Sequence, residues 1–344
     1  MYTMDRVLEI GGFAAGYCGR LFVQSGFDVV RIEPQPTSFG WVSQAASDYY
    51  LHAGKRRINT SDSALIAELA EEANIVVAEA ATFDSLSALG FGDWQTAVKV
   101  SITPFGATGP KRNWQATPGV ILAMGGYTNL MGDPDRAPLT LPGHYPEFQS
   151  GAFAYTAANA CRIAKQENTI DIGMLEVVMA LSQFTTVMWH CANTIRSRHG
   201  NDFWTVVPTN LFRCIDGWAY LNIVPTFWDV FSVFLNRPEL LIDARFKSND
   251  LRSQNRDALH DIIADTISGM TRLEIEQRAT DTRVPVGVVQ TLSEVLDDPH
   301  LKQREFWQSV TDGHSTVQSP RPAWKIHGDS LSELQLTEPE STHG

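Results

Sequence analysis

A glutamate near the middle of the chain stands where a carboxylate could do chemistry. Glu147 follows a stretch rich in glycine and proline and precedes an apolar run with helical spacing, residues 151–163. A carboxylate in the first turn of a helix is favoured by the helix dipole and by backbone N–H groups that lack intrahelical partners. Such a residue can serve catalysis or simply stabilise the start of the helix. Spacing alone leaves both roles open for Glu147.

The turn after the first strand-like run suggests a different chemistry, dinucleotide binding. Residues 11–16 read Gly-Gly-Phe-Ala-Ala-Gly, and Glu33 ends the next strand-like run, where an acidic residue could bind a ribose hydroxyl. The glycines do not fit the pattern G-x-G-x-x-G. A tight turn between a strand and a helix is therefore the simpler explanation, and an NAD(P)-dependent enzyme is poorly supported.

Two further chemistries find less support in the sequence. Ser150-Gly151 lacks the first glycine of the nucleophile elbow, G-x-S-x-G, that serine hydrolases need. His190-Cys191 pairs two residue types that bind zinc, but it lies in an apolar helical run, which favours a packed core pair. We therefore predict no metal site and no permanently bound cofactor.

The charge balance limits the partners of the chain. Its 344 residues carry 27 basic and 39 acidic side chains, a net charge of −12. An acidic chain has no general attraction to nucleic acid, so we predict no nucleic-acid partner. Local basic clusters, Lys55-Arg56-Arg57 and Lys111-Arg112, could still bind a polyanion. A solvated basic turn explains the first cluster equally well and the second one better.

Cysteine usage and hydropathy favour the cytoplasm. The four cysteines are far apart and form no CxxC pair, as in a protein with reduced thiols. The first seven residues lack the apolar run of a secretory signal. We also find no apolar stretch of about 18 residues that could span a membrane. These features predict a cytoplasmic protein without a membrane partner.

The elements that must position Glu147 follow from an alternating pattern. Short apolar strands are expected at residues 7–10, 28–32, 75–77 and 97–102, with helices between them. Such alternation predicts an α/β fold with a Rossmann-like, doubly wound parallel sheet. A second pattern of strands and helices follows, and it predicts a smaller α+β domain. We place the large domain at 1–204 plus 297–344 and the small domain at 205–296.

Several segments resemble class III CoA-transferases, the superfamily of formyl-CoA transferase, carnitine-CoA transferase and α-methylacyl-CoA racemase. Val29-Val30-Arg31-Ile32-Glu33-Pro34 is similar to the family's V-I-K-V-E-P, and His52-Ala53-Gly54-Lys55-Arg56-Arg57 to its N-R-G-K-R-S. Further similarities occur, in family order, at residues 100–110, 132–135, 170–176 and 283–288. The family's nucleophilic aspartate begins a D-x-x-x-G step, and here that step reads Glu147-Phe148-Gln149-Ser150-Gly151.

The resemblance implies a function and a site. Glu147 takes the place of the catalytic aspartate and would carry anhydride and thioester intermediates while CoA moves from an acyl-CoA to a carboxylic acid. Coenzyme A and acyl-CoA would be substrates. The residues expected to bind CoA are Phe13, Ala14, Ala15, Lys55, Arg56, Ala80, Gln115 and Thr117. Thr117 stands where the racemase branch has its histidine base, which disfavours racemisation.

The resemblance also implies an assembly. Family members form an interlocked homodimer with the site at a domain interface, so we expect a homodimer of this kind. Glu147, Gln115 and the segment Glu79-Ala80-Ala81 depart from the family pattern. These departures keep a second hypothesis open, a non-catalytic subunit or scaffold that pairs with an active paralogue.

Overall fold

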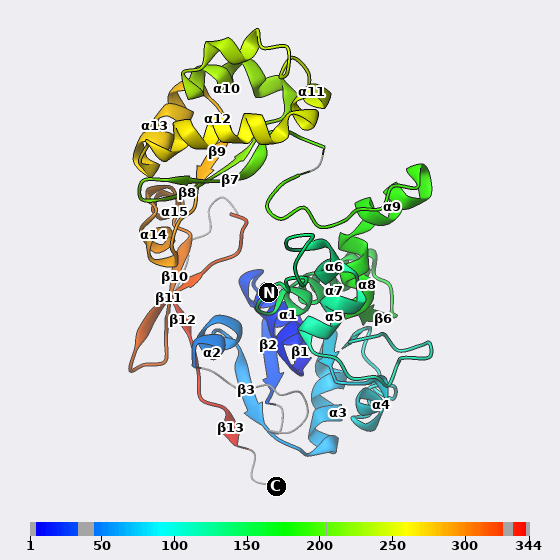
Figure 1. Cartoon of the computed structure of the whole chain (residues 1–344). Coiled ribbons are helices and arrows are strands. Elements are labelled where there is room, and N and C mark those ends of the chain that lie inside the picture. Colours follow the sequence, from blue (N-terminus) through cyan, green and yellow to red (C-terminus); the bar gives the residue numbers. More distant parts are fainter. Residues whose placement is uncertain (1–4, 34–44, 204, 326–332, 342–344) are drawn as a thin grey trace. The chain divides into compact units, whose positions relative to one another are not determined.

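The computed structural model describes residues 5–33, 45–203, 205–325 and 333–341 (Figure 1). Pro34 of the family-like motif lies outside these residues. The chain divides into two compact units. One unit comprises Met1–Thr128, Thr140–Ile195 and Pro299–Gly344, and the other comprises Asn129–Leu139 and Arg196–Asp298. The domain limits expected from the sequence stay a prediction.

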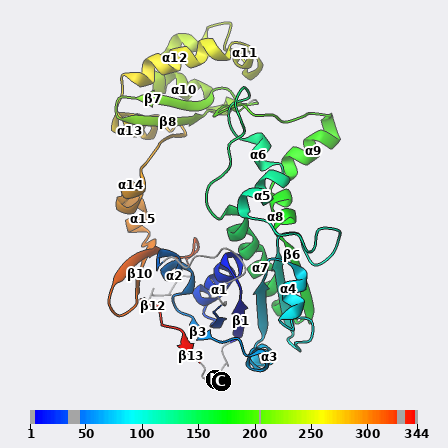
Figure 2. The ribbon, with the colours of Figure 1, turned by 60° about the horizontal axis from the view of Figure 1, so that its bottom comes forward.

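A parallel sheet of seven strands forms the centre of the first unit. Its strands are β1 (Arg6–Ile10), β2 (Asp28–Ile32), β3 (Arg56–Asn59), β4 (Ile75–Glu79), β5 (Val98–Thr103), β6 (Asn168–Gly173) and β13 (Glu340–Ser341). They are ordered β13-β3-β2-β1-β4-β5-β6, and every neighbouring pair is parallel. Strands β13, β3, β2, β1 and β6 are labelled in Figure 1, and Figure 2 shows the sheet from another side. The predicted α/β fold is confirmed.

Helices cover both faces of this sheet because successive strand residues point to opposite sides. Val7 and Val77 pack with α1 (Phe13–Gln24), α5 (Pro118–Met124), α7 (Tyr145–Ala164) and α8 (Met174–Leu181). Leu8 and Val76 pack on the other face with α3 (Ser63–Glu72) and α4 (Phe83–Ala88). Strands buried on both faces are expected to read as short continuous apolar runs, as these do.

Helix α7 approaches α1 closely because Gly151 has no side chain. A Cβ at Gly151 would lie 2.5 Å from the carbonyl oxygen of Ala14 and 3.1 Å from the backbone nitrogen of Cys18. Both distances are shorter than ordinary carbon contacts, and both atoms belong to the backbone of α1. The glycine therefore sets the spacing between the two helices, and Glu147 lies one turn before it on α7.

The start of one helix needs correction. The apolar run with helical spacing at residues 151–163 belongs to a helix that begins earlier, at Tyr145, and so includes Glu147.

The region from Met174 forms two helices, α8 and then α9 (Gln183–Ala192). The break lies at Ser182, whose hydroxyl donates to the carbonyl of Met179 (3.0 Å) and so offers the backbone an alternative to continued helix.

The C-terminal segment of the first unit joins the elements that begin the chain. It contains α15 (Pro299–Gln303) and a small sheet of β10 (Trp307–Thr311), β11 (Thr316–Pro320) and β12 (Leu334–Gln335). Arg20 of α1 is fully buried and donates to the carbonyl of Pro320 (2.9 Å) and the hydroxyl of Ser319 (3.3 Å). Helix α2 (Ala45–His52) contacts β11 as well.

The second unit has its own antiparallel sheet and core. Its sheet has the order β7-β8-β9, formed by β7 (Thr209–Cys214), β8 (Gly217–Asn222) and β9 (Val286–Val288). The main helices of this unit are α10 (Trp228–Leu235), α11 (Asn249–Gln254), α12 (Arg256–Ser268), α13 (Arg272–Thr282) and α14 (Leu292–Asp297). Helices α10 and α12 bury Phe231, Phe234 and Ile263 in one core with Phe212 and Leu221 of the sheet. This is the α+β architecture that the sequence predicted.

Candidate active site

Glu147 is a buried carboxylate whose two oxygens differ in their hydrogen bonding. It is the third residue of α7, and only 8% of its surface is exposed. Its Oε1 lies 3.1 Å from Nδ1 of His144. Its Oε2 is buried and has no hydrogen-bond partner among the described residues. Burial raises the pKa of Glu147, and the contact with His144 partly opposes that rise.

Aromatic rings surround the start of α7. His144 directly precedes the helix, and its ring stacks on Phe13 with 4.1 Å between centroids and 11° between planes. Phe148 meets Phe13 edge-on at 4.7 Å and Tyr17 at 4.8 Å. These rings lower the access of water to the carboxylate side of α7, as chemistry through a hydrolysable intermediate requires.

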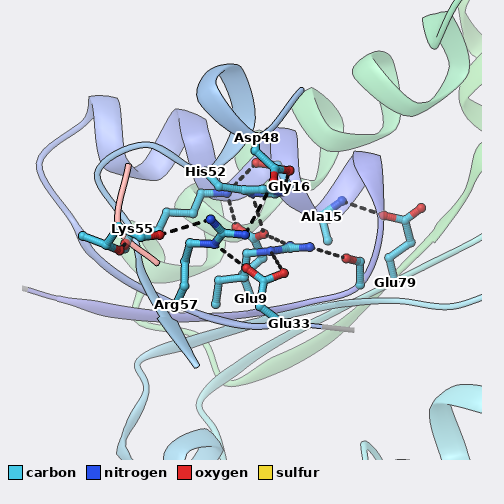
Figure 3. Close-up of polar contacts among 12 residues, drawn as sticks. Glu9, Ala15, Gly16, Glu33, Asp48, His52, Lys55, Arg57 and Glu79 are labelled. Atoms are coloured by element: carbon cyan, nitrogen blue, oxygen red, sulfur yellow. Dashed lines mark hydrogen bonds and ion pairs between the residues drawn. The ribbon is translucent and has the colours of Figure 1, made fainter. Parts of the chain in front are cut away.

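A second buried carboxylate lies close to the first. Glu79 ends β4, and its Oε2 accepts a hydrogen bond from the backbone N–H of Ala15 (2.8 Å) in the first turn of α1 (Figure 3). The pKa of Glu79 is raised to about 7. Burial is the largest cause, the N–H of Ala15 opposes it, and the negative charge of Glu147 adds to it. The two carboxylates therefore influence each other's ionisation.

Glycines at the end of β1 make room for Glu79. A Cβ at Gly11 would lie 2.6 Å from the carbonyl oxygen of Glu79, and Gly11 has a φ of +127°, which favours glycine. A Cβ at Gly12 would lie 3.1 Å from Oε1 of Glu79. The glycine turn thus brings the start of α1 onto a carboxylate of a neighbouring strand.

The sheet order explains the place of this site. Strands β1 and β4 are neighbours, and the chain runs from β1 toward β2 on one side and from β4 toward β5 on the other. Ligands of open α/β sheets bind beyond the carboxyl ends of the strands at such a switch point. The turn after β1 and Glu79 at the end of β4 both lie there.

Beneath α1 lies a network of buried ions. Lys55 is 2% exposed, and its ammonium group pairs with Glu9 and donates to the carbonyl of Gly16 (2.8 Å) (Figure 3). Arg31 is fully buried and pairs with the other oxygen of Glu9. Burial lowers the pKa of Lys55 to about 8, although Glu9 favours the charged form. Charged groups this deep need such partners, so the network ties β1, β2 and α1 together.

The network continues along the edge strands. Arg57 of β3 pairs with Glu33 and lies 3.7 Å from Asp48 of α2. His52 is 1% exposed between these cations, and burial followed by the charge of Arg31 lowers its pKa well below the ordinary value. In the basic cluster Lys55-Arg56-Arg57, Lys55 and Arg57 therefore serve the structure and do not form a solvated turn.

The structure brings part of the predicted site together. Phe13, Ala14 and Ala15 form the first turn of α1, Phe13 reaches the start of α7 through His144, and Ala80 follows Glu79 in the chain. Arg56 is exposed instead and pairs with Glu340 (2.9 Å). Gln115 and Thr117 are exposed in the segment before α5. CoA binding by these residues stays a prediction.

The sequence analysis overlooked two residues near Glu147. His144 stands three positions before Glu147, a spacing that brings side chains together at a helix start, and the sequence analysis did not use this spacing. Glu79 was noted only as part of a departure from the family pattern. Its position at the end of a buried strand, where α/β proteins bind ligands, was the signal that could have identified it.

The described residues contain neither a cluster of metal ligands nor a membrane-spanning helix. They contain no group of three His, Cys, Asp or Glu side chains that could hold a metal ion. No helix among them is both long and apolar enough to cross a bilayer.

Fold and site together describe an α/β protein with a buried carboxylate at a helix start. The family model described as CoA-transferase family III matches residues 5–342. The chain belongs to this family and is a class III CoA-transferase.

Similar curated proteins carry related names. A succinyl-CoA–D-citramalate CoA-transferase of Chloroflexus aurantiacus is 27% identical, and the match covers 89% of this chain and 83% of the relative. A succinyl-CoA:mesaconate CoA-transferase of Haloarcula hispanica is 28% identical over 89% of this chain and 84% of its own length.

Solved structures show the same fold. A CAIB/BAIF family protein from Brucella suis matches with a TM-score of 0.80 and 22% identity over 96% of this chain and 93% of that one. A hypothetical protein from Mycobacterium tuberculosis matches with a TM-score of 0.82 and 21% identity over 100% of this chain and 97% of that one.

Proposed function

We propose that this CoA-transferase uses Glu147 as its nucleophile. The observation that carries the proposal is the state of the carboxylate: it is buried, one oxygen contacts His144, and the other oxygen has no hydrogen-bond partner among the described residues. An oxygen without a hydrogen bond keeps its lone pairs available for attack. The resemblance to the D-x-x-x-G step supports the same role.

The reaction follows from carboxylate chemistry. The Glu147 carboxylate attacks the thioester carbonyl, the C–S bond breaks, and an anhydride forms with release of CoA thiolate. The thiolate attacks the glutamyl carbonyl, which frees the donor acid and leaves a glutamyl thioester. The acceptor carboxylate then attacks this thioester to form a second anhydride and thiolate. Attack of the thiolate on the acceptor carbonyl yields the new acyl-CoA and restores Glu147.

Among the eight residues that the resemblance implies, binding of CoA is proposed at the start of α1 rather than at Lys55, whose ammonium group is buried against Glu9. The first turn of α1 supports this proposal because backbone N–H groups there favour negative charge. Glu79 already accepts the N–H of Ala15, so Phe13 and Ala14 are the nearer candidates for an anionic group. Several relatives are named for succinyl-CoA, which makes short dicarboxylic acids the first substrates to test.

A homodimer in the cytoplasm is the proposed setting. In the first unit, α9 and the residues after it expose large apolar side chains, among them Phe184 at 55%, Trp189 at 47% and Ile195 at 76%. Large apolar side chains exposed close together along one segment are typical of an interaction site. The described cysteines are free thiols, as expected in a reducing compartment.

A second candidate function is a non-catalytic subunit. The observation that favours it is that Glu79 accepts the N–H of Ala15, a donor that could otherwise stabilise a bound anion. One relative, of Chloroflexus aurantiacus, is named as the alpha subunit of a succinyl-CoA–L-malate CoA-transferase.

A transfer assay separates the two candidates. Purified protein is incubated with succinyl-CoA and a panel of mono- and dicarboxylic acids, and new acyl-CoA species are measured by chromatography and mass spectrometry. We expect transfer to at least one acid, and loss of transfer in Glu147→Gln. Transfer by the Gln variant at the rate of the parent protein would exclude Glu147 as the nucleophile. No transfer across the panel would favour the non-catalytic subunit.

A further inference from the structure

The contact between His144 and Glu147 has a role beyond the start of the helix. We propose that His144 is a positioning residue for CoA transfer, which fixes Oε1 of Glu147 so that Oε2 attacks the thioester. This inference rests on the proposed function of Glu147 as nucleophile.

The contact assigns different tasks to the two carboxylate oxygens. Nδ1 of His144 lies 3.1 Å from Oε1, and an ionised carboxylate only accepts hydrogen bonds, so Nδ1–H is the donor. Oε2 is buried and lacks a hydrogen-bond partner in the described part of the chain. The hydrogen bond draws electron density toward Oε1. Oε2 is therefore the more nucleophilic oxygen, and substrate binding must expose it, because it is buried in the free protein.

One face of the His144 ring is held by stacking, while 48% of the side chain stays exposed. Its ring lies parallel to that of Phe13 at 4.1 Å, and Phe13 is buried at the first position of α1. Phe148 supports Phe13 edge-on at 4.7 Å. A side chain whose rotation is limited by stacking presents its donor in a constant direction, which is what a preorganised site needs.

Glutamate needs this support more than aspartate does. Its side chain has one more rotatable bond, so the carboxylate samples a larger volume and loses more conformational entropy when it is fixed. A donor three residues away at the start of the same helix limits that motion. The His144 contact thus offsets the extra methylene that separates Glu147 from the family's aspartate.

A purely structural role fits the site less well. His144 occupies the position before α7 from which a side chain can cap the helix, yet its side chain makes no capping bond to the N–H groups of the helix in the described structure. Its contact goes to the carboxylate instead.

Two variants of His144 separate the donor from the ring. His144→Asn places an amide nitrogen two bonds from Cβ, where Nδ1 stands, but removes the ring. His144→Phe keeps a ring over Phe13 but has no donor. We would measure kcat, KM for acyl-CoA and the rate of acyl-enzyme formation for both, with circular dichroism melting as the check on folding.

We expect His144→Phe to lower kcat about tenfold and to leave KM unchanged. A tenfold loss corresponds to the loss of one hydrogen bond to a charged group. His144→Asn should recover most of kcat. Full activity in the Phe variant, or equal losses in both variants, would overturn the positioning role. The role of Glu147 as nucleophile is tested separately. If the parent protein forms no labile adduct on Glu147, that result refutes the nucleophile itself, whereas the two His144 variants test only the positioning of Glu147.

Discussion

At the scale of single residues, the chemistry depends on the position of the Glu147 carboxylate. Glu147 carries the functional group of aspartate on a side chain longer by one C–C bond, roughly 1.5 Å. In this chain α7 starts at Tyr145, and His144 lies beside Oε1 of Glu147. Burial and the aromatic rings of Phe13 and Phe148 then set the surroundings of the carboxylate.

Shortening Glu147 to the family's own residue should therefore reduce activity. In Glu147→Asp the carboxylate withdraws from His144 and from the substrate, and a misplacement of ~1 Å costs about 100-fold in rate. We expect kcat to fall by about this factor in a steady-state transfer assay, while the melting temperature changes little. An Asp variant as active as the parent would show that the pocket is not shaped for glutamate.

The pH dependence should report both buried carboxylates. The nucleophile is the ionised form of Glu147, and burial raises the pKa of this group, so kcat should fall as the pH drops through the raised value. The charge of Glu147 also raises the pKa of Glu79. Glu147→Gln removes that charge and should therefore lower the pKa of Glu79 from about 7, which NMR titration of the side-chain carboxyl carbon measures. An unchanged or higher pKa of Glu79 in this variant would contradict the coupling.

At the scale of elements, the start of α1 and the start of α7 must keep a fixed position relative to each other. Glu79 at the end of β4 accepts the N–H of Ala15, and Gly151 allows the backbones of α1 and α7 to approach. A change at either point moves an element that carries part of the site.

Gly151→Ala tests this packing. The new Cβ would lie 2.5 Å from the Ala14 carbonyl oxygen, which belongs to the backbone and cannot turn aside. We expect a loss of about 1–3 kcal/mol in the free energy of unfolding, the usual cost of an overpacked core, and a lower kcat because Glu147 shifts with α7. Denaturant melts and the transfer assay measure the two effects.

Gly119→Ala is the matched control. Gly119 lies within helix α5, and a Cβ there meets nothing within 4 Å. This variant should be as stable as the parent or slightly more stable, because alanine favours helix. Equal destabilisation by both alanines would show that close packing is not the reason for Gly151.

At the scale of the whole molecule, the exposed apolar residues of α9 and the segment after it predict self-association. We expect analytical ultracentrifugation to find a species with the mass of two chains. Replacing Phe184 and Trp189 by aspartate puts charges where 55% and 47% exposed rings stand, and should convert this species to the monomer without loss of secondary structure. A parent protein that is monomeric at all concentrations would refute the proposed dimer.

Much of the fold could be predicted from the sequence because strands buried on both faces are short, apolar and β-branched. Residues 28–32 and 75–77 are of this type, and both lie in the sheet. Strand β3 was missed because its sequence, Arg-Arg-Ile-Asn, is charged. Arg57 is tolerated there only because Glu33 and Asp48, distant in sequence, neutralise it, and no local pattern reveals such partners.

The candidate site could be predicted only in part for the same reason. Glu147 was visible from its position in a motif, and His144 from its spacing to Glu147 once the helix start is known. The approach of Glu79 to Ala15 depends on the sheet order, which joins residues 64 positions apart. The burial of Lys55 depends on Glu9 of another strand, so a basic cluster alone could not show whether it faces CoA or the core.

The nucleophile is the central claim, and a covalent adduct tests it most directly. Protein incubated with an acyl-CoA panel would be treated with hydroxylamine, digested and mapped by mass spectrometry, with Glu147→Gln as the control. We predict a hydroxamate on Glu147 in the parent protein and none in the variant. A hydroxamate on another carboxylate, or transfer activity without any adduct at Glu147, would contradict the mechanism.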